Sequence, residues 1–205
     1  ILVCNKEAYD ALPKRWIHKA HMFAVCGVSS DDLAMVLPSK DPRPIFSVMS
    51  AGKLLRIKGF DLAIRSFAEF AKQYPQSELV LIGDGPDLQY LQELSLKLNI
   101  SELVRFEQWM SREKLLQLMA GSDVFLFCSL RDGGGAVVVE AMSMSTPIVC
   151  LDISGPSMHV DEASGIKVFA GSPEQAMSDI SKALEKLYLD VNLRVKMGRS
   201  ARERT

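Results

Sequence analysis

From residue 45 onward, short apolar runs alternate with amphipathic segments, and this alternation limits the fold more than any other feature of the sequence. The apolar runs have the length of strands, whereas the segments between them carry apolar residues at helical spacing. Alternating strands and helices form right-handed βαβ units, which build a mainly parallel sheet with helices on both faces. The sequence therefore predicts an α/β fold, with strands at residues 45–50, 79–82, 103–106, 124–127, 148–151 and 166–169.

The segments between these strands predict the helices that would cover the sheet. Pro75 ends the first of them, Pro86 stands just before the second, and Ser111 is a suitable N-cap for the third. Loops that lead from strands into such helices gather at the carboxyl ends of the strands, where α/β sheets bind their ligands. We expect helices at residues 59–74, 87–98, 112–120 and 136–144, and a last one that starts near residue 173.

The beginning of the chain lacks this alternation and predicts a separate part of the protein. Residues 1–4 and 22–26 have strand character, and residues 6–16 have helical character that Pro13 should interrupt. Residues 41–44, Asp-Pro-Arg-Pro, should form a stiff connector. We therefore expect three parts: residues 1–44 as the remnant of a preceding domain with a linker and the first strand of this domain, residues 45–193 as the main domain, and residues 194–205 as the start of a truncated C-terminal helix.

The composition is that of an ordinary globular protein, and it excludes several classes of function. Of the 205 residues, 48% are hydrophobic and 24% are charged, which argues against disorder and suits one large α/β domain. The formal net charge of −1 lacks the basic excess of nucleic-acid-binding proteins, so we expect no nucleic-acid partner. No apolar run has the length of a membrane span, and the N-terminus lacks the pattern of a signal peptide.

The cysteines and histidines predict neither disulfides nor a metal site. No two cysteines form a C-x-x-C pair, and all lie in or beside strand-like runs, so we expect buried thiols in a reducing compartment, the cytoplasm. The histidines lack the spacing of metal ligands, so we expect no metal bound by side chains of this chain. These residues are Cys4, Cys26, Cys128, Cys150, His18, His21 and His159.

The stretch that carries the most chemistry is a glycine-rich loop between a strand and a helix. Asp132 precedes the three glycines at residues 133–135, and Glu140 follows eight positions after Asp132. A glycine turn at the start of a helix lets backbone N–H groups approach an anion closely. Two carboxylates at this spacing can hold hydroxyl groups around the same anion. The loop therefore predicts a site for a phosphorylated, hydroxyl-rich ligand such as a nucleotide sugar.

A second loop supplies positive charge. The strand that ends at Gly52 is followed by Lys53 and Lys58, and the next helix begins directly after them. Two ammonium groups beside a helix N-terminus suit a diphosphate, because Coulomb attraction and the helix dipole act together there. The alternative is a pair of lysines that only face solvent.

Three further features each leave two interpretations open. The turn at residues 83–86, Gly-Asp-Gly-Pro, either lines a ligand cleft or is a tight strand-to-helix turn. Gln108, Trp109 and Met110 follow a strand and could hold a flat base, or Trp109 could pack against a neighbouring helix or domain. His159 lies in a glycine-containing loop and either faces a ligand or stands at a helix start with no ligand.

Taken in order, these segments resemble the C-terminal, donor-binding domain of GT-B glycosyltransferases, and among them the retaining enzymes of glycosyltransferase family 4. The family's G-R-L-x-x-x-K-G is matched by Gly-Lys-Leu at 52–54 and Lys-Gly at 58–59. Its G-D-G-P is present at 83–86, and its acid-G-F-G-x-x-x-x-E is matched between Asp132 and Glu140. The resemblance runs from about residue 48 to residue 169 and implies a Rossmann-like fold, the C-terminal half of a GT-B protein.

The resemblance also implies a role for each matched residue. Lys53, Lys58 and Asp132 would be the catalytic residues, with both lysines on the diphosphate and Asp132 on hydroxyl groups of the donor sugar. Glu140 would bind the ribose, the amides of the glycine loop would approach sugar and phosphate, and Met110 and Gln108 would border the base. The donor-binding residues implied are Gly52, Gly83, Asp84, Gln108, Met110, Gly133, Gly134, Gly135, Ala136 and Glu140.

The function implied is the retaining, metal-independent transfer of a sugar, of the hexosyltransferase type, in polysaccharide or glycoconjugate biosynthesis. The donor would be a UDP-, GDP- or ADP-sugar, bound as a substrate with no further cofactor. A missing N-terminal domain would hold the acceptor and could associate with a membrane surface. The residues present here would then bind donor and transfer sugar poorly by themselves.

Two departures from the family pattern support a different class of function. Lys53 stands where the family has arginine, and Asp132 stands where it has glutamate. These changes would also fit a nucleotide-binding or interaction module without catalytic activity. A sugar-nucleotide epimerase shares the architecture and remains a further alternative, whereas an NAD-dependent oxidoreductase would need a G-x-G-x-x-G turn, which is absent.

Overall fold

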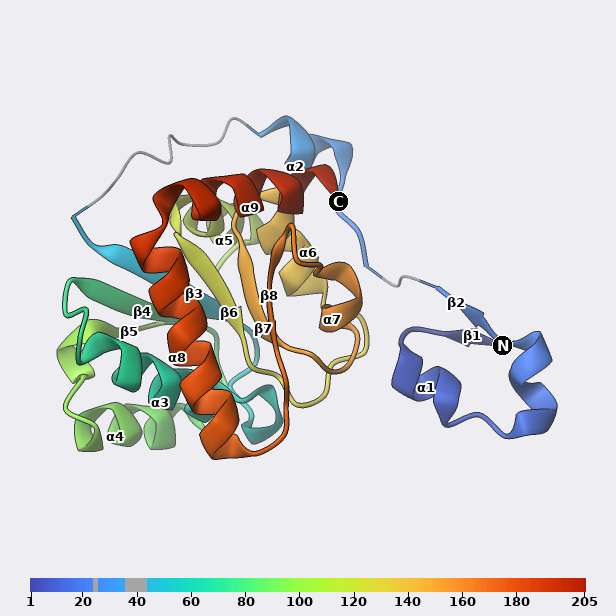
Figure 1. The fold of residues 1–205 in the computed structure, drawn as a ribbon, viewed down its shortest axis with the longest axis horizontal. Coiled ribbons are helices and arrows are strands. Elements are labelled where there is room, and N and C mark those ends of the chain that lie inside the picture. Colours follow the sequence, from blue (N-terminus) through green and yellow to red (C-terminus); the bar gives the residue numbers. More distant parts are fainter. Residues whose placement is uncertain (24–25, 36–43) are drawn as a thin grey trace.

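Six parallel strands form the sheet that the alternation predicts (Figure 1). The computed structural model describes residues 1–23, 26–35 and 44–205. Across the sheet the strands follow the order β5-β4-β3-β6-β7-β8, and every neighbouring pair is parallel. The α/β prediction is therefore confirmed, with strands β3 (Phe46–Ala51), β4 (Ser77–Ile82), β5 (Val104–Glu107), β6 (Val124–Phe127), β7 (Ile148–Leu151) and β8 (Gly165–Val168).

The four central strands β3, β4, β6 and β7 send apolar side chains to both faces of the sheet, because successive side chains point in opposite directions. In β6, Val124 and Leu126 join the apolar cluster on one face, whereas Phe125 and Phe127 join the cluster on the other. Strands covered on both faces carry apolar runs without polar alternation. The short apolar runs in the sequence are thus a direct consequence of the two helical layers.

The two faces are covered by different helices (Figure 1). One face packs against α3 (Phe60–Ala71), α4 (Leu88–Lys97) and α8 (Pro173–Leu189). The opposite face packs against α5 (Arg112–Gly121) and α6 (Ala136–Ser143). The closing helix α9 (Val191–Glu203) contacts α6, α8 and β8.

Most predicted helices lie within a few residues of their expected positions, and the differences have local causes. The first helix does not include Gly59, which is instead its N-cap with a φ of 67°. Helix α9 begins at Val191, so the expected boundary after residue 193 falls inside this helix. Two short helices, α2 (Ser30–Ala34) and α7 (Pro156–His159), were not predicted, because fewer than two turns carry little periodicity.

The N-terminal residues form a small lobe beside the main body (Figure 1). Strands β1 (Leu2–Val3) and β2 (His21–Met22) pair in parallel around α1 (Lys6–Asp10) and the 3₁₀ helix η1 (Lys14–Lys19). The helical segment expected at residues 6–16 is interrupted before Pro13, as predicted. The strand expected at residues 22–26 is wrong for Phe23 and Cys26, which are not in a strand, and its residues 24–25 lie outside the described residues. Residues 41–43 of the expected connector also lie outside them.

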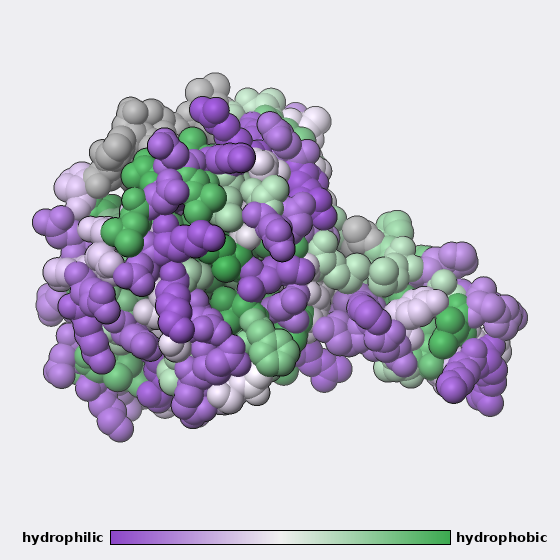
Figure 2. Space-filling view, viewed as in Figure 1, coloured by the Kyte–Doolittle hydropathy of each residue, from purple (hydrophilic) through white to green (hydrophobic). Residues whose placement is uncertain are grey.

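The surface of the near face is mainly hydrophilic, but apolar groups remain exposed between the charged side chains and on the N-terminal lobe (Figure 2). On that lobe the exposed fraction is 70% for Leu2 and 57% for Phe23. Within the described ranges, no helix combines the length and apolar character needed to cross a membrane.

The four cysteines are all free thiols, but only two of them are buried. Burial raises the pKa of the Cys150 thiol to about 12 and also raises that of Cys128. Cys4 and Cys26 are half-exposed, so the expectation that all four lie in the core is wrong for these two. Both belong to the N-terminal part of the chain, outside the six-stranded sheet.

Replacing Gly59 by alanine should destabilise the fold. A Cβ atom at Gly59 would lie 2.1 Å from the carbonyl oxygen of Cys128, and the φ of +67° disfavours any side chain. We expect Gly59→Ala to lower the free energy of unfolding by more than about 2 kcal/mol, measured by urea denaturation. Gly27→Ala is the matched control, because its Cβ would meet nothing within 4 Å. Equal stability of the two variants would contradict this interpretation.

Candidate functional site

The candidate site lies where the order of the strands reverses. β3 and β6 are neighbours, and from them the sheet continues to β4 on one side and to β7 on the other. The loops that leave β3 and β6 therefore diverge to opposite sides and open a crevice at the carboxyl edge, the usual ligand site of such sheets. The lysine loop follows β3 and the glycine loop follows β6, so the topology brings together the two loops that the sequence singled out.

Backbone contacts fix these two loops to each other. The N–H of Leu130 donates to the carbonyl oxygen of Ile57 at 2.9 Å. Two residues after Ile57, Gly59 approaches Cys128 so closely that no Cβ would fit between the two backbones. The loops from β3 and β6 are therefore parts of one rigid edge.

Lys58 and Asp132 form an ion pair across this edge. The distance from Lys58 Nζ to Asp132 Oδ2 is 2.6 Å, and only 25% and 17% of the two side chains are exposed. The other carboxylate oxygen, Oδ1, accepts a hydrogen bond of 2.7 Å from the N–H of Gly135. Partial burial acts to raise the pKa of Asp132, but the bonds from Lys58 and the glycine loop outweigh it and lower this pKa.

The glycine loop turns sharply into α6. Gly135 is the N-cap of this helix with a φ of 67°, and Ala136 is the first helical residue. A Cβ at Gly135 would lie 2.9 Å from Pro156, so the loop after β7 packs directly against the turn. The first backbone N–H groups of a helix have no partner within that helix, and a helix start of this kind favours anions.

Glu140, on α6, has a partner that the sequence did not predict. Its Oε1 accepts a hydrogen bond of 3.0 Å from Arg112 Nε, and Arg112 also forms two bonds, of 2.6 and 3.0 Å, with Asp32 of α2. The bonds from Arg112 hold the pKa of Asp32 well below its usual range. Glu140 therefore belongs to a charged group of three, with Arg112 and Asp32.

Lys53 is separated from this ion pair and lies at the mouth of another hollow. It is exposed and, with Asp84 and Trp109, lines a cavity of about 320 Å³. Within the described parts of the chain it makes no ion pair. The structure therefore places one lysine in an ion pair and another, exposed and unpaired among the described residues, beside a cavity.

Gly83 and Asp84, which follow β4, lie against the lysine loop at Gly52. A Cβ at Gly83 would lie 1.9 Å from the carbonyl oxygen of Gly52, so the two backbones touch. One Asp84 carboxylate oxygen accepts a hydrogen bond of 3.1 Å from the N–H of Trp109. These residues act at least as tight turns that hold neighbouring loops in register.

The loop after β5 presents a mixed surface. Gln108 is exposed, Trp109 is 56% exposed, and Met110 is half-buried against the core on the α5 and α6 face. Trp109 is thus not packed inside the described part of the chain. This loop offers an aromatic and an amide group at the carboxyl edge, beside the cavity that Lys53 lines.

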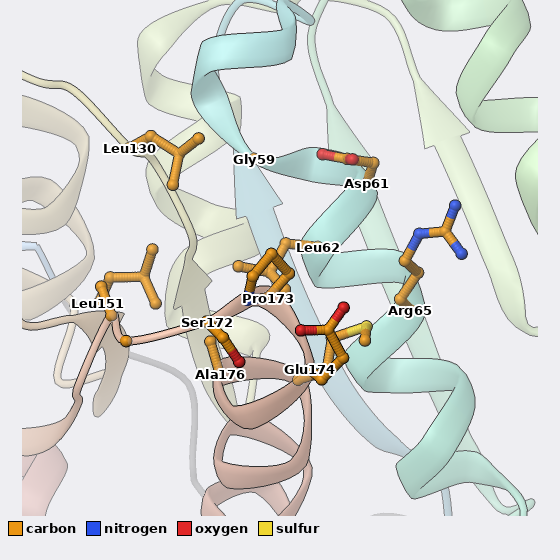
Figure 3. Close-up of a pocket in the computed structure, with 13 residues that line it drawn as sticks. Gly59, Asp61, Leu62, Arg65, Leu130, Leu151, Ser172, Pro173, Glu174 and Ala176 are labelled. Atoms are coloured by element: carbon orange, nitrogen blue, oxygen red, sulfur yellow. The ribbon is translucent and has the colours of Figure 1, made fainter.

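A further cavity, not predicted from the sequence, lies between the first turns of α3 and α8 (Figure 3). Its volume is about 380 Å³, and apolar side chains such as Leu62, Leu130 and Leu151 line it together with Arg65 and Glu174. Lys53, Lys58 and Asp132 do not line it. Among the described residues, no three His, Cys, Asp or Glu side chains gather as metal ligands do.

Residues 37–204 match the family model described as glycosyl transferases group 1. The chain belongs to this family. It is 34% identical over 158 residues to a D-inositol 3-phosphate glycosyltransferase of Corynebacterium jeikeium, which covers 73% of this chain and 37% of that protein. It is 30% identical over 210 residues to the lipopolysaccharide core biosynthesis glycosyltransferase LpsE of Rhizobium meliloti, which covers 98% of this chain and 58% of that protein. The chain therefore spans about a third to three fifths of the length of these relatives.

Solved structures share the fold at low sequence identity. The pneumococcal O-GlcNAc transferase GtfA, crystallised with UDP and GlcNAc, superimposes with a TM-score of 0.80 at 17% identity, over 99% of this chain and 40% of GtfA. WaaG, a glycosyltransferase of lipopolysaccharide biosynthesis, gives a TM-score of 0.79 at 18% identity, over 98% of this chain and 57% of WaaG. The prediction of the Rossmann-like, C-terminal half of a GT-B fold is confirmed. The roles of the site residues, membership of family 4, retention and independence from metal remain predictions.

The Lys58–Asp132 pair should make stability depend on pH. Because the pKa of Asp132 is lower in the folded protein than its ordinary value of about 3.9, the ionised carboxylate contributes stability that is fully present above that value. This contribution is lost as the pH falls through the folded pKa. We expect urea unfolding between about pH 3 and pH 6 to show a steeper acid loss of stability for the wild type than for Asp132→Asn.

A double-mutant cycle controls for other acid-titrating groups. Lys58→Met should remove much of the same pH-dependent contribution, and adding Asp132→Asn to it should change the slope little. An unchanged acid slope in Asp132→Asn would contradict the assigned direction of the pKa shift.

Proposed function

We propose that this chain is the nucleotide-sugar-binding domain of a retaining glycosyltransferase of family 4. Membership of the glycosyl transferases group 1 family makes transferase chemistry the starting point. One observation supports the donor site above all others: Lys58 and Asp132, which lie far apart in the sequence, meet at 2.6 Å beside the N-terminus of α6. A cation, a carboxylate and free helix amides are the groups that a sugar diphosphate needs.

In this proposal the lysines act on the leaving group. The bond between the anomeric carbon and the phosphate oxygen breaks, and negative charge grows on the nucleoside diphosphate. Lys58 and Lys53 stabilise that charge together with the amides of α6, with no requirement for a divalent metal. The acceptor oxygen attacks the same face of the sugar and forms the new glycosidic bond. Its proton passes to the departing phosphate, and the configuration is retained.

Asp132 serves two purposes in this scheme. Its carboxylate accepts hydrogen bonds from hydroxyl groups of the donor sugar, and it also holds Lys58 in place. The arriving diphosphate attracts the same ammonium group, so Lys58 is shared between Asp132 and phosphate once donor is bound. Because the ion pair with Asp132 fixes the direction of Lys58, the charge that stabilises the leaving group is already oriented.

The ribose and base occupy the crevice between α6 and the loop after β5. Glu140 accepts hydrogen bonds from the ribose hydroxyls, while Gln108 and Met110 border the base. UDP and glucose are bound in the solved structure of HepE from Anabaena, which superimposes with a TM-score of 0.71 at 18% identity over 99% of this chain and 58% of HepE. This likeness makes a UDP-sugar the first donor to test here.

Calorimetric titration with UDP-, GDP- and ADP-sugars tests the donor site. We expect one of them to bind, and we expect Lys58→Ala and Lys53→Ala each to weaken it at least about tenfold, because each removes a charge-assisted contact to phosphate. If no nucleotide sugar binds at millimolar concentration, the proposed function is wrong for this chain.

Two controls separate lost binding from lost folding. Lys72→Ala removes an exposed lysine at the other end of α3 and should leave affinity unchanged. Lys53→Ala breaks no ion pair among the described residues, so its effect cannot come from an unpaired Asp132. Unchanged affinity in both Lys53→Ala and Lys58→Ala would mean that the site is assigned to the wrong residues.

The role of Glu140 predicts sensitivity to the ribose. For the nucleotide that binds, the 2′-deoxy and 3′-deoxy analogues should bind the wild type up to about tenfold more weakly, because a hydrogen bond to a carboxylate is lost. Glu140→Gln should reduce that preference for ribose. Calorimetry with the matched nucleotides measures the ratio of ribose to deoxyribose affinity in the wild type and in Glu140→Gln. An equal ratio in the two proteins would exclude Glu140 from the ribose site.

A further inference from the structure

We propose that His159 is a positioning residue of the donor site, which acts by fixing the peptide group between Gly134 and Gly135 in the glycine loop. This role rests on the proposed function, because it assigns a task to a loop that would carry sugar and diphosphate. His159 was singled out in the sequence with two interpretations open. It neither faces the crevice as a ligand-binding side chain nor stands at a helix start, since it is the last residue of α7.

The carbonyl oxygen of Gly134 receives two side-chain contacts from behind the loop. His159 Nε2 lies 2.9 Å from this oxygen, and Cys26 Sγ lies 3.0 Å from it. A carbonyl oxygen only accepts hydrogen bonds, so both Nε2–H and the thiol S–H must donate. Burial, with the charges of Asp132 and Glu140, raises the pKa of Cys26, which keeps the thiol protonated and able to donate near neutral pH.

The other end of the same peptide group is bound as well. A peptide group is planar and trans, so its C=O and N–H point in opposite directions. The carbonyl of Gly134 points to His159, and the N–H of Gly135 therefore points away from His159, where Asp132 Oδ1 accepts it at 2.7 Å. Asp132 in turn is bound by Lys58. His159, the peptide group, Asp132 and Lys58 thus form one continuous chain of hydrogen bonds.

The segment that carries His159 is itself attached to the loop. The N–H of Gly155 donates to the carbonyl oxygen of Asp132 at 3.0 Å, and Pro156 packs against Gly135. From the other side, Arg204 Nε donates to the carbonyl oxygen of His159 at 2.7 Å. His159 is therefore held in place from both sides. Its contact with the carbonyl oxygen of Gly134 is fixed as a result.

Without His159, the peptide group could rotate and turn the Gly135 N–H away from Asp132. The carboxylate of Asp132 would then lose one of its hydrogen-bond donors and would no longer be fixed in one direction. Donor contacts that depend on this direction would weaken, whereas contacts of ribose and base, made by Glu140 further along α6 and by the loop after β5, would not. His159 would thus affect the sugar and diphosphate part of the ligand selectively.

Two substitutions test this role. His159→Gln can still donate from its amide nitrogen to the carbonyl of Gly134, whereas His159→Leu has a similar size and no donor. Leucine is preferred to alanine, because a cavity of about 350 Å³ borders His159 and Cys26, and a water admitted there could replace the missing donor. Cys26→Ser and Cys26→Ala form a second pair, because serine keeps a hydrogen-bond donor to the carbonyl of Gly134 and alanine has none.

The first readout needs no ligand. Amide hydrogen exchange of Gly135, followed by NMR, should be at least about tenfold faster in His159→Leu than in the wild type, and His159→Gln should restore the slow rate. Exchange at core amides such as that of Leu126 reports global stability and should change little. Equal Gly135 exchange in wild type and His159→Leu would overturn the proposal, even if no nucleotide sugar binds.

The second readout compares two ligands. We expect His159→Leu to bind the nucleotide sugar about tenfold more weakly than the wild type and to bind the matching nucleoside monophosphate with unchanged affinity. His159→Gln should recover the affinity for the nucleotide sugar. If Gly135 exchanges faster in His159→Leu but the affinity for both ligands falls equally, the positioning role is overturned and only a structural role is left. Failure of the wild type to bind either ligand would instead overturn the proposed function, while the exchange rates still decide whether His159 fixes the loop.

Discussion

The pairing of β3 with β6 is the interaction on which the rest of the structure depends. Val48 pairs with Val124 and Met49 with Phe125, which joins two strands that more than 70 residues separate in the chain. The first crossover covers one face of the sheet and the later one covers the other, so the loops after these strands diverge at the carboxyl edge. Without this pairing, neither loop would have a partner, and the charged residues they carry would be ordinary surface residues.

The charges that this strand pairing brings together balance one another within the protein. Lys58 is paired with Asp132, and Glu140 is paired with Arg112, which also binds Asp32. Such pairing makes half-buried charges tolerable, and it also fixes their directions. A sugar diphosphate would have to share these ions rather than order them, so the energy of binding is not spent on arranging side chains. The exposed Lys53 differs, because it is free to follow the phosphate at the rim.

Local patterns in the sequence predicted the sheet and the positions of the two loops. They could do so because apolar runs reflect the burial of the strand that contains them, and glycines reflect the tight turn in which they lie. They could not predict Arg112, Asp32 or Cys26 as neighbours of the site. Asp32 reaches Arg112 across 80 residues, and Cys26 reaches the glycine loop across 108. Such contacts join segments that are far apart in the sequence, and no period or motif records them.

The glycine loop shows why a motif can be correct and still incomplete. Its glycines permit a tight turn, but glycine also permits many other conformations, so the motif alone does not fix one of them. The structure selects a conformation through groups from distant segments: the amide of Asn5 on the carbonyl of Gly133, Gly155 on Asp132, and His159 on Gly134. The glycines that allow many conformations are therefore local. The residues that select one conformation come from the N-terminal lobe and from the segment that follows β7.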